Sequence, residues 1–452
     1  MTDLPRGWAA TTVAEVGAAG EQTVLTGPFG SNLGREDFTS SGVPVLTIGC
    51  LGTDGISKSK LLHVSPSTAK KLVSYRLRPG DFLFSRMASV GRAGIVPDDL
   101  DGALFNYHLM RLRLNGSTIS SRLFFHYVRG SHLVREYLDA VSRGATRDGI
   151  NTTLLLKMPV WLPPISEQRR IVAKIDSLSA NSKRARDNLD HIPRLAGKYK
   201  QAILMAAFRG ELGNDTARML PSSHLKDLCI SITDGDHQAP PKAANGVPFI
   251  TIAAMNDGVI KLEKATRFVP QSYVDSLKPS RRPAIDDILY SVTGSIGIPA
   301  LVNVDDPFVF QRHIAILKPN RQKVSPNYLY RLLAAPQVME QALAVATGTA
   351  QLTIPLAGLR EFEIPSPALD QQIEISRRIE NAFTWIDRLA SEATSARKLI
   401  DRLDQAILAK AFRGELVPQD ASDEPASVLL ERMKAARSSI SAERKQKKKS
   451  WQ

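Results

Sequence analysis

The sequence is poor in the residues that hold small domains together through disulfides or metals. Only two of its 452 residues are cysteine, Cys50 and Cys229, and neither has a histidine or a second cysteine at the spacing of a zinc site. No run of 18 apolar residues occurs, and Met1 to Trp8 lack the basic and apolar regions of a signal peptide. We therefore expect no disulfide framework, no metal site and a location in the reducing cytoplasm.

Short motifs of common catalytic chemistries are missing as well. The chain has no GxxxxGK[ST] phosphate loop, no glycine-rich turn fit for a nucleotide cofactor and no Asn/Asp-Pro-Pro-aromatic motif of amino-methyltransferases. HExxH, GxSxG and HxE with CxxC are also absent. His108 and His313 each begin an apolar run, where a structural role is favoured over a catalytic base or a DNA contact. Together these absences argue against an enzyme, and no catalytic residue is assigned.

Charge of one sign is in excess. The chain has 59 Lys and Arg against 45 Asp and Glu, a formal net charge of +14, and the excess is spread along its length. Such a balance favours a polyanionic partner such as nucleic acid, although basic proteins have other uses. The length exceeds that of one ordinary core, so two or more domains are expected.

The chain contains an internal repeat with an offset of about 204 residues. QAILMAAFRGEL, from Gln201 to Leu212, returns as QAILAKAFRGEL, from Gln405 to Leu416, identical at ten of twelve positions. The same shift relates GVPVLTIG (residues 42–49) to GVPFITIA (residues 246–253). The similarity is strong in the helical segments and weak between the two globular halves. Two copies of one scaffold therefore carry two divergent surfaces.

Each copy combines a globular part with a helical part. Short β-branched runs alternate with Gly- and Pro-marked turns, and a helical stretch follows them in each half. The expected strands are 43–48, 81–85 and 108–114 in the first copy and 248–252, 287–292 and 313–317 in the second; the expected helices are 122–141 and 327–345.

Two long helices close the two copies. Apolar or small residues alternate in steps of four and three from Ile171 to Ile203, and adding 204 gives the same register from Ile375 to Ile407. A seam of about five heptads favours pairing of the helices over two separate amphipathic helices. Pro193 is expected to kink or break the first helix, and Gly210 and Gly414 are expected to end the two.

These patterns predict an α+β protein with two mixed α/β domains in a tandem pseudo-repeat, each followed by a long helix, the helices pairing as an antiparallel coiled coil. The expected domains are residues 1–165 and 217–368. The expected helical regions are 166–216 and 369–452, the second ending in a basic tail.

Over nearly its whole length the chain resembles the specificity subunits of type I restriction-modification systems. The resemblance is carried by LPRGW (residues 4–8), GPFGSNL (27–33), PPISEQRRIVAKID (163–176), both QAIL…AFRGEL segments and ELVPQDASDEPASVLLERM (415–433). In the second half GPFGSNL has no clear counterpart and SITDGDHQAP (231–240) stands in its place, so the DNA-contacting loop there is left open.

The resemblance implies two target-recognition domains that read a bipartite DNA site with an unspecified spacer. It also implies two adenine methyltransferase subunits, which bind S-adenosylmethionine, and ATP-driven, Mg²⁺-dependent restriction and translocase subunits. This chain itself would bind no cofactor; its helices would set the spacer and dock the methyltransferases. Antiparallel helices would relate the copies by an approximate two-fold axis that matches the dyad of DNA. A self-contained restriction enzyme and a coiled-coil scaffold without sequence-specific DNA binding are the alternatives.

Candidate contact residues come from the loops and from the repeated motif. Basic and polar loop residues are expected to hold phosphates, and a few of them to read base edges. The candidates for DNA binding are Asn32, Arg35, Lys58, Lys60, Arg86, Ser89, Arg92, Lys242, Lys261, Arg281, Arg282, Thr293, Ser295 and Arg312. A helix stop explains the Gly and Arg of AFRGEL but not the other repeated residues, which a partner bound twice would explain. The candidates for partner binding are Gln201, Phe208, Arg209, Glu211, Gln405, Phe412, Arg413 and Glu415.

Overall fold

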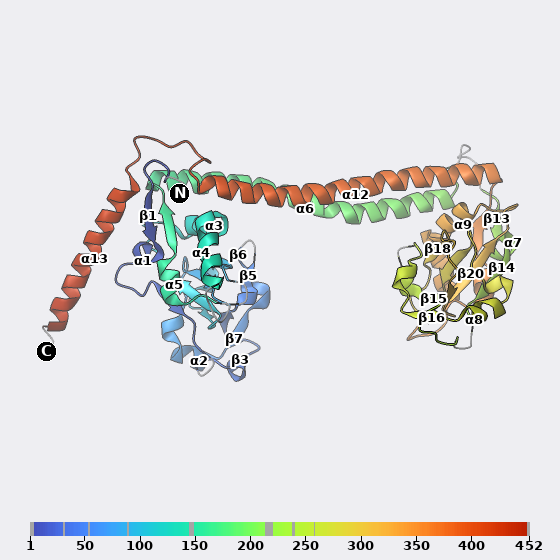
Figure 1. Cartoon of the computed structure of the whole chain (residues 1–452), viewed down its shortest axis with the longest axis horizontal. Helices are drawn as coiled ribbons and strands as arrows, with labels where there is room; N and C mark the ends of the chain where they lie inside the picture. The colour runs from blue at the N-terminus through green and yellow to red at the C-terminus, as the bar shows by residue number, and fades with distance from the viewer. Residues whose placement is uncertain are drawn as a thin grey trace. The chain divides into compact units, whose positions relative to one another are not determined.

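The computed structural model describes residues 4–29, 32–52, 55–87, 90–143, 149–212, 220–236, 240–256 and 258–449, with side chains for all of these but 142, 143 and 440–449. The chain divides into two compact units. The first unit comprises Met1–Asp187 and Arg397–Gln452, and the second comprises Asn188–Ala396. Each unit holds one globular domain and a part of each of two long helices (Figure 1).

The domain of the first unit is built on two small sheets. One sheet has the order β2-β11-β8-β9 and is antiparallel; the other has the order β10-β4-β7-β3 and includes one parallel pair. Two further strand pairs, β1-β12 and β5-β6, lie beside them. The strands are β1 (Ala9–Thr12), β2 (Val24–Thr26), β3 (Phe38–Thr39), β4 (Val43–Leu46), β5 (Leu51–Gly52), β6 (Gly55–Ile56), β7 (Leu62–Val64), β8 (Phe82–Ser85), β9 (Ala93–Ile95), β10 (Leu104–Phe105), β11 (Leu109–Leu112) and β12 (Pro159–Leu162); the helices are α1 (Val13–Val16), α2 (Pro66–Lys71), α3 (Ser121–Gly130), α4 (His132–Arg143) and α5 (Thr152–Lys157).

The domain of the second unit repeats this plan. Its sheets have the orders β14-β20-β17-β18 and β16-β15-β19, and β13 pairs with β21 as β1 pairs with β12. The strands are β13 (Ser222–His224), β14 (Cys229–Asp234), β15 (Val247–Ile250), β16 (Arg267–Val269), β17 (Ile288–Ser291), β18 (Pro299–Leu301), β19 (Val309–Phe310), β20 (Ile314–Pro319) and β21 (Glu363–Pro365); the helices are α7 (Leu225–Leu228), α8 (Gln271–Ser276), α9 (Pro326–Leu333), α10 (Pro336–Val345) and α11 (Leu356–Arg360). The predicted tandem repeat of a mixed fold is confirmed. Each single helix expected after the strands is instead a pair, α3 with α4 and α9 with α10.

The continuous apolar run of β8 follows from its place between two cores. Phe82 and Phe84 point into one core together with α3, and Leu83 points into a second core together with Leu109. All four of these side chains are fully buried. A strand covered on both faces has no solvent side on which a polar residue would be favoured, so its sequence does not alternate.

The two long helices, α6 (Ile165–Phe208) and α12 (Leu369–Ala411), pack together in antiparallel orientation. In the first unit Arg186 forms an ion pair with Asp404 at 2.6 Å, and in the second unit Lys200 forms one with Asp387 at 2.6 Å. A later residue of α6 thus pairs with an earlier residue of α12, as expected for antiparallel helices. Of the kink or break expected at Pro193, the break is wrong, because α6 runs through Pro193 without interruption; the kink stays a prediction. A proline removes one backbone hydrogen bond from a helix. The packing of apolar residues that flank Pro193 against α12 outweighs that loss.

Each copy of the repeated QAIL…AF segment packs on the domain of the other copy. Leu204 and Ala207 of the first segment enter the core of the second domain, whereas Leu408 and Ala411 enter the core of the first. A Cβ added at Gly130 would lie 2.4 Å from the Cβ of Leu408, so only glycine allows this approach. The core of each domain is thus completed by residues of a long helix that lies outside that domain.

Both segments end at a glycine, as expected. Gly210 has φ +80° and Gly414 has φ +74°, the left-handed conformation that ends a helix. Another segment of chain packs on each glycine: Leu220, which follows in the sequence, on Gly210, and Pro5, from the N-terminal segment, on Gly414. The N-terminal segment therefore takes the same place beside the second copy that residue 220 takes beside the first.

The last helix, α13 (Ala426–Lys449), belongs to the first unit. Leu430 and Met433 are buried in the core of that unit, and the Arg437 guanidinium donates hydrogen bonds to the carbonyl oxygens of Ala14 and Gly17 at 2.9 and 2.6 Å. In the part of the chain that the structure describes, no helix is both long and apolar enough to cross a membrane.

A buried histidine joins α3 to α6 in the first unit. His126 is 4% exposed, and its Nε2 lies 3.2 Å from Oδ1 of Asp176, which also receives a hydrogen bond from Arg122. Burial, and next the nearby charge of Arg122, lower the pKa of His126 from 6.5 to about 4. The imidazole is therefore neutral at pH 7, and the contact with Asp176 is a hydrogen bond rather than an ion pair.

The stability of the first unit is therefore expected to decrease as the pH is lowered from about 6.5 to about 4. In that pH range the unfolded chain binds a proton at His126 that the folded chain does not bind. Because one pKa unit corresponds to about 1.4 kcal/mol, the free energy of unfolding at pH 4 is lower by about 3 kcal/mol. His126→Gln should remove this part of the pH dependence. Urea unfolding at pH 7, 5.5 and 4.5 measures it, with exposed His191→Gln as the matched control. Equal pH slopes for the His126 variant and the parent would contradict the assignment.

Candidate nucleic-acid interface

Equivalent glycines open the first loop of each domain. The backbone N–H of Gly27 donates to the carbonyl of Leu109 at 3.1 Å, and that of Gly235 donates to the carbonyl of Ile314 at 3.3 Å. A Cβ on Gly27 would lie 2.2 Å from the Asn106 carbonyl oxygen, and one on Gly235 would lie 2.6 Å from the Gln311 carbonyl carbon. The loop that begins at Gly235 therefore holds the place of the GPFGSNL loop in the fold, and its contact with DNA stays a prediction.

A second loop has the same backbone frame in both domains. Arg86 N donates to the carbonyl of His108 at 3.0 Å, and Val292 N donates to the carbonyl of His313 at 2.9 Å. The turn that follows contains a left-handed glycine in each copy, at positions 91 and 297. Two positions of this loop therefore have equivalent backbones in the two domains but different side chains. Arg86 of the first domain corresponds to Val292 of the second, and Tyr107 corresponds to Arg312.

In the first domain these loops bring together a group of planar side chains. The Phe29 ring is 56% exposed and stacks on Tyr107, with ring centroids 6.1 Å apart and an interplanar angle of 26°. The Arg86 guanidinium lies 5.8 Å from the Phe29 ring centroid and donates to the Tyr107 carbonyl at 3.4 Å. Tyr107 also contacts His108, with centroids 3.9 Å apart. Arg86 was expected here; Phe29 and Tyr107 were missed, although an aromatic residue between two glycines was a visible signal.

His108 is a structural member of this group. Burial, followed by the positive charge of Arg86, lowers the pKa of His108 below its usual range, so its ring is neutral at pH 7. A neutral ring in contact with Tyr107 fits the structural role that the sequence favoured. Protonation of this ring would add a second positive charge beside Arg86.

The other candidates of the first domain fall into two groups. Asn32, Arg35 and Arg92 are exposed and close in sequence to the two loops, and Asn32 N donates to the Phe29 carbonyl at 2.8 Å. Lys58 and Lys60 are exposed on a turn between β6 and β7, where Lys58 forms an ion pair with Asp99. Ser89 lies outside the described residues.

Several candidates of the second domain already have protein partners. Arg281 lies 3.6 Å from Asp234 and 3.5 Å from Asp236, and Arg282 donates to the Leu277 carbonyl at 2.9 Å. These contacts give both arginines a structural role. Thr293 is half-buried and forms a β-bridge with Thr353, Lys261 is half-buried, and Lys242, Ser295 and Arg312 are exposed.

An acidic residue in the first loop of the second domain, Asp236, was not among the predicted contact residues. Asp236 directly follows Gly235, and its carboxylate accepts a hydrogen bond from the Tyr273 hydroxyl at 3.2 Å. A carboxylate only accepts hydrogen bonds, so at a base edge it selects an amino group such as that of cytosine. The chemistry of this loop therefore differs in charge from that of the Phe29 loop.

Residues of the repeated motif behave alike in both copies, with one exception. Arg209 and Glu211 form an exposed ion pair at 2.6 Å, and Arg413 and Glu415 form the same exposed pair at 2.8 Å. Gln201 and Gln405 are exposed as well.

Phe412 was predicted to bind a partner, but it is buried. Its ring is 1% exposed in the core of the first unit, edge-to-face with Tyr127 at 5.1 Å, so it has no surface to offer a partner. Phe208 is half-buried against the core of the second domain. Truncation of a fully buried phenylalanine costs about 3–5 kcal/mol of stability, so Phe412→Ala would report unfolding before any lost partner contact.

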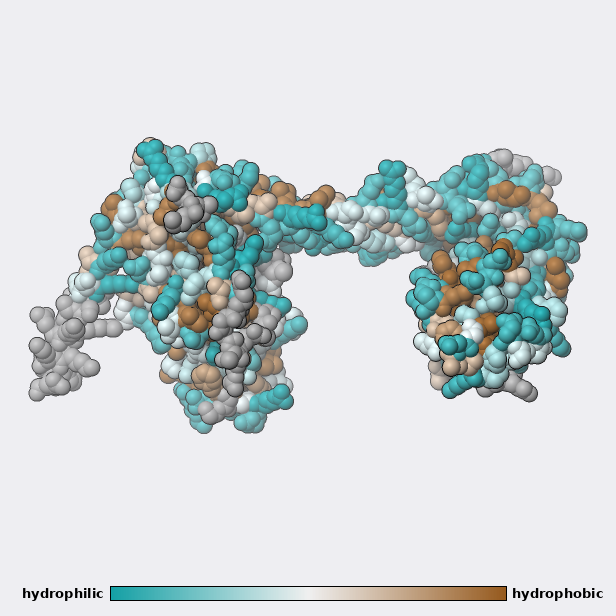
Figure 2. All heavy atoms as spheres, viewed as in Figure 1, coloured by the Kyte–Doolittle hydropathy of each residue, from teal (hydrophilic) through white to brown (hydrophobic). Residues whose placement is uncertain are grey.

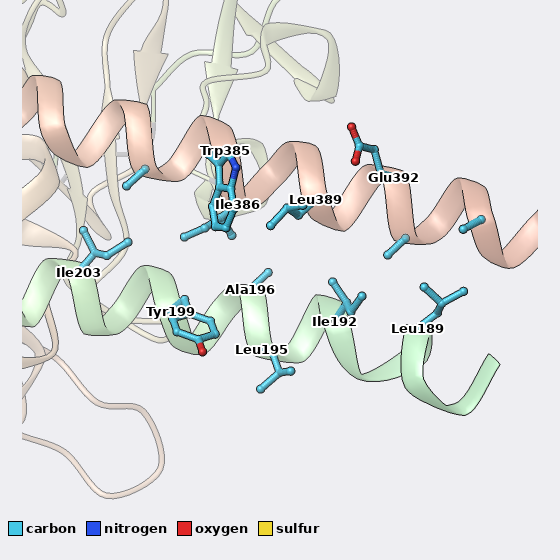
Figure 3. A pocket seen from close by; sticks show the side chains of 13 residues that line it. Leu189, Ile192, Leu195, Ala196, Tyr199, Ile203, Trp385, Ile386, Leu389 and Glu392 are labelled. Atoms are coloured by element: carbon cyan, nitrogen blue, oxygen red, sulfur yellow. The ribbon is translucent and has the colours of Figure 1, made fainter. Parts of the chain in front are cut away.

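An apolar groove runs between α6 and α12 within the second unit (Figure 3). Its volume is 730 Å³, and Glu392 is the one charged residue among those that line it. Trp385 is 63% exposed and Tyr199 is 62% exposed. The groove is lined by Leu189, Ile192, Leu195, Ala196, Tyr199, Ile203, Ala382, Trp385, Ile386, Leu389, Glu392, Ala393 and Ala396. The heptad pattern had predicted these residues, apart from Leu195, Trp385 and Glu392, as part of a closed seam, and the structure leaves part of the seam open.

On the face of the molecule shown in Figure 2, hydrophilic residues predominate and hydrophobic residues form separate patches. Among the described residues no group of three or more His, Cys, Asp and Glu is placed to hold a metal ion. Burial raises the pKa of the Cys229 thiol to about 12, which makes it a poor nucleophile.

Comparisons with known proteins agree with this architecture. Residues 30–190 and 222–392 match the model of the type I restriction modification DNA specificity domain. The EcoBI specificity subunit of Escherichia coli is 24% identical over 430 residues, covering 88% of this chain and 89% of that protein. The EcoKI specificity subunit of Escherichia coli K12 is 25% identical over 355 residues, covering 74% of this chain and 75% of that protein.

The fold is also that of a solved relative. The crystal structure of the HsdS subunit from Thermoanaerobacter tengcongensis covers 91% of this chain and 98% of its own, with a TM-score of 0.58 and 22% sequence identity. Two family domains in tandem, one per unit, account for the repeat in the sequence and for the matching sheet orders. The chain therefore belongs to the type I restriction modification DNA specificity family, as its sequence motifs indicated.

Proposed function

We propose that each domain of this specificity subunit reads one half of a bipartite DNA target. The observation that carries the proposal is the shared backbone of the two loops in each domain, combined with different side chains at equivalent positions. A common frame gives both domains the same way of approaching DNA. Different side chains, such as Arg86 against Val292, give each domain its own sequence preference. The family assignment supports this function over that of a coiled-coil scaffold.

The division of labour follows from the side chains available. Arg86 has a guanidinium that suits the O6 and N7 acceptors of guanine, whereas Asp236 suits an amino group. The exposed Arg35, Arg92, Lys242 and Arg312 suit phosphate contacts, which fix the register of the protein on the duplex without reading sequence. The net charge of +14 supports the electrostatic part of binding.

We further propose that the paired helices dock two methyltransferase subunits and set the spacer between the half-sites. The groove with Tyr199 and Trp385 supports docking, because exposed aromatic residues in an apolar groove are typical anchors of a protein interface. Continuous helices of 44 and 43 residues are stiff connections of roughly 65 Å, which supports a fixed spacer. S-adenosylmethionine, ATP and Mg²⁺ would act in the partner subunits.

Methylation mapping tests the proposal directly. Cells that express this chain with its methyltransferase partner are expected to carry methyladenine at one bipartite motif, with two different half-sites and a fixed spacer. The matched control expresses the methyltransferase alone and should show no such motif. Methylation without a bipartite motif, or methyl transfer by the rigorously purified chain alone, would overturn the assignment.

A further inference from the structure

The group around Phe29 leaves an aromatic ring exposed in the first loop of the first domain, which the proposed function assigns to DNA binding. Phe29 rests on Tyr107, Tyr107 rests on His108, and the Arg86 guanidinium lies over the Phe29 ring. The pKa of His108 is lowered, so the group carries one positive charge, that of Arg86, at neutral pH.

Exposure of this ring is different from the ordinary exposure of a surface apolar residue. Single exposed aliphatic side chains are common in soluble proteins. Phe29 instead lies in a loop whose first residue, Gly27, is fixed against Asn106, and its ring is held by two planar neighbours. Its conformation is thus largely settled before any ligand binds, and 56% of its surface remains available.

We propose that the Phe29 ring stacks on a base of the first half-site that has left its place in the duplex stack. Every base has a flat π face, and aromatic side chains are the usual platforms for unstacked bases. The base would continue the column that Tyr107 and Phe29 already form, with the Arg86 guanidinium beside it. This inference rests on the proposed DNA-reading function and adds a local distortion of the target to it.

At two described positions the second domain differs from this column. Val292 takes the position of Arg86, and Arg312 takes the position of Tyr107. The residue two positions after Gly235, His237, lies outside the described residues. The distortion is therefore assigned to the first half-site, and the second half-site serves as an internal control.

Fluorescence of 2-aminopurine tests the proposal, because its emission rises when the base loses its stacked neighbours. The full chain with its methyltransferase, without S-adenosylmethionine, is bound to target duplexes. The duplexes carry the probe at each adenine of either half-site except the methylated ones. We expect a rise of several-fold at one or more positions of the first half-site only. Phe29→Leu keeps an apolar side chain but loses the ring, so it should abolish the rise. It should also weaken binding roughly 5- to 150-fold, equivalent to about 1–3 kcal/mol for one stacked base.

The controls separate this inference from the proposed function. Val73 is 64% exposed in the same unit, and Val73→Ala should leave both fluorescence and affinity unchanged. A rise that persists in Phe29→Leu overturns the stacking role. Specific binding with no rise at any position also overturns it, and leaves the DNA-reading function intact. If uracil in place of thymine reproduces the loss of affinity, Phe29 contacts a thymine methyl group instead. Absence of any preference for the target duplex contradicts the proposed function itself.

Discussion

Exchange of residues 220–366 for the equivalent domain of a relative with another target is expected to replace one half of the methylated site and preserve the other. The structure defines where the exchange should begin and end. Ser222 of β13 pairs with Pro365 of β21, and Ser366 N donates to the Pro221 carbonyl at 2.7 Å. Both junctions therefore lie side by side at the base of the domain, and the strands between them move as one piece.

A shorter exchange that stops at residue 350 is expected to fail. Ile354, Leu359, Phe362 and Ile364 belong to the core of the second domain, so that boundary would divide one core between two parents. The donor domain also has to accept the side chains of α6 and α12 that enter this core. Leu204 and Ala207 come from the first helix, and Ile375 and Ile379 come from the second.

Methylome sequencing of the chimera measures the outcome. The matched control exchanges residues 8–163, bounded by β1 and β12, whose strands pair in the same way as β13 and β21. That chimera should change the opposite half-site. A simultaneous change of both half-sites in either chimera would show that the domains do not read DNA independently.

The sequence predicted the repeat because ten of twelve identical positions are visible without any structure. It also predicted the strand at 82–85 and the two helix stops, because runs of apolar residues and glycines act locally. It did not predict that Leu408 packs on Gly130, because that contact joins positions far apart in the sequence and depends on how α12 packs on the first domain. For the same reason it offered Phe412 as a partner-binding residue, although the ring is buried in the core of the first unit.

The candidate contact residues were predicted from their residue types, because the sequence does not show which residues surround them in the fold. Arg281 and Arg282 were predicted to bind DNA because they are basic loop residues. The structure adds protein partners, namely Asp234, Asp236 and a backbone carbonyl, and their contact with DNA stays a prediction. Counter-charges come from other loops, and a sequence does not show them. The equivalence of Gly27 and Gly235 was hidden for a related reason. It depends on close approach of two backbones, and the residues around each glycine have diverged.

Substitution of both Tyr199 and Trp385 by lysine is expected to prevent assembly with the methyltransferase. The two side chains are 62% and 63% exposed, so the free chain should fold and melt as the parent does. A single aromatic anchor at an interface commonly contributes 2 kcal/mol or more, which is about 30-fold in affinity. Two buried lysine charges in an apolar contact add an electrostatic cost. A loss on the order of 100-fold or more in the affinity for the methyltransferase is therefore expected.

Pull-down and sedimentation with the purified methyltransferase measure the assembly, and circular dichroism checks the fold. The matched control carries lysine at Val73 and Val259, which are 64% and 47% exposed and lie outside the groove. It adds the same charge, so a general electrostatic effect would appear in both variants. Preferential loss in the Tyr199 and Trp385 variant locates the docking surface in the groove between α6 and α12. Unchanged affinity would instead direct the search to the exposed Arg209–Glu211 and Arg413–Glu415 pairs, which occur identically in both copies.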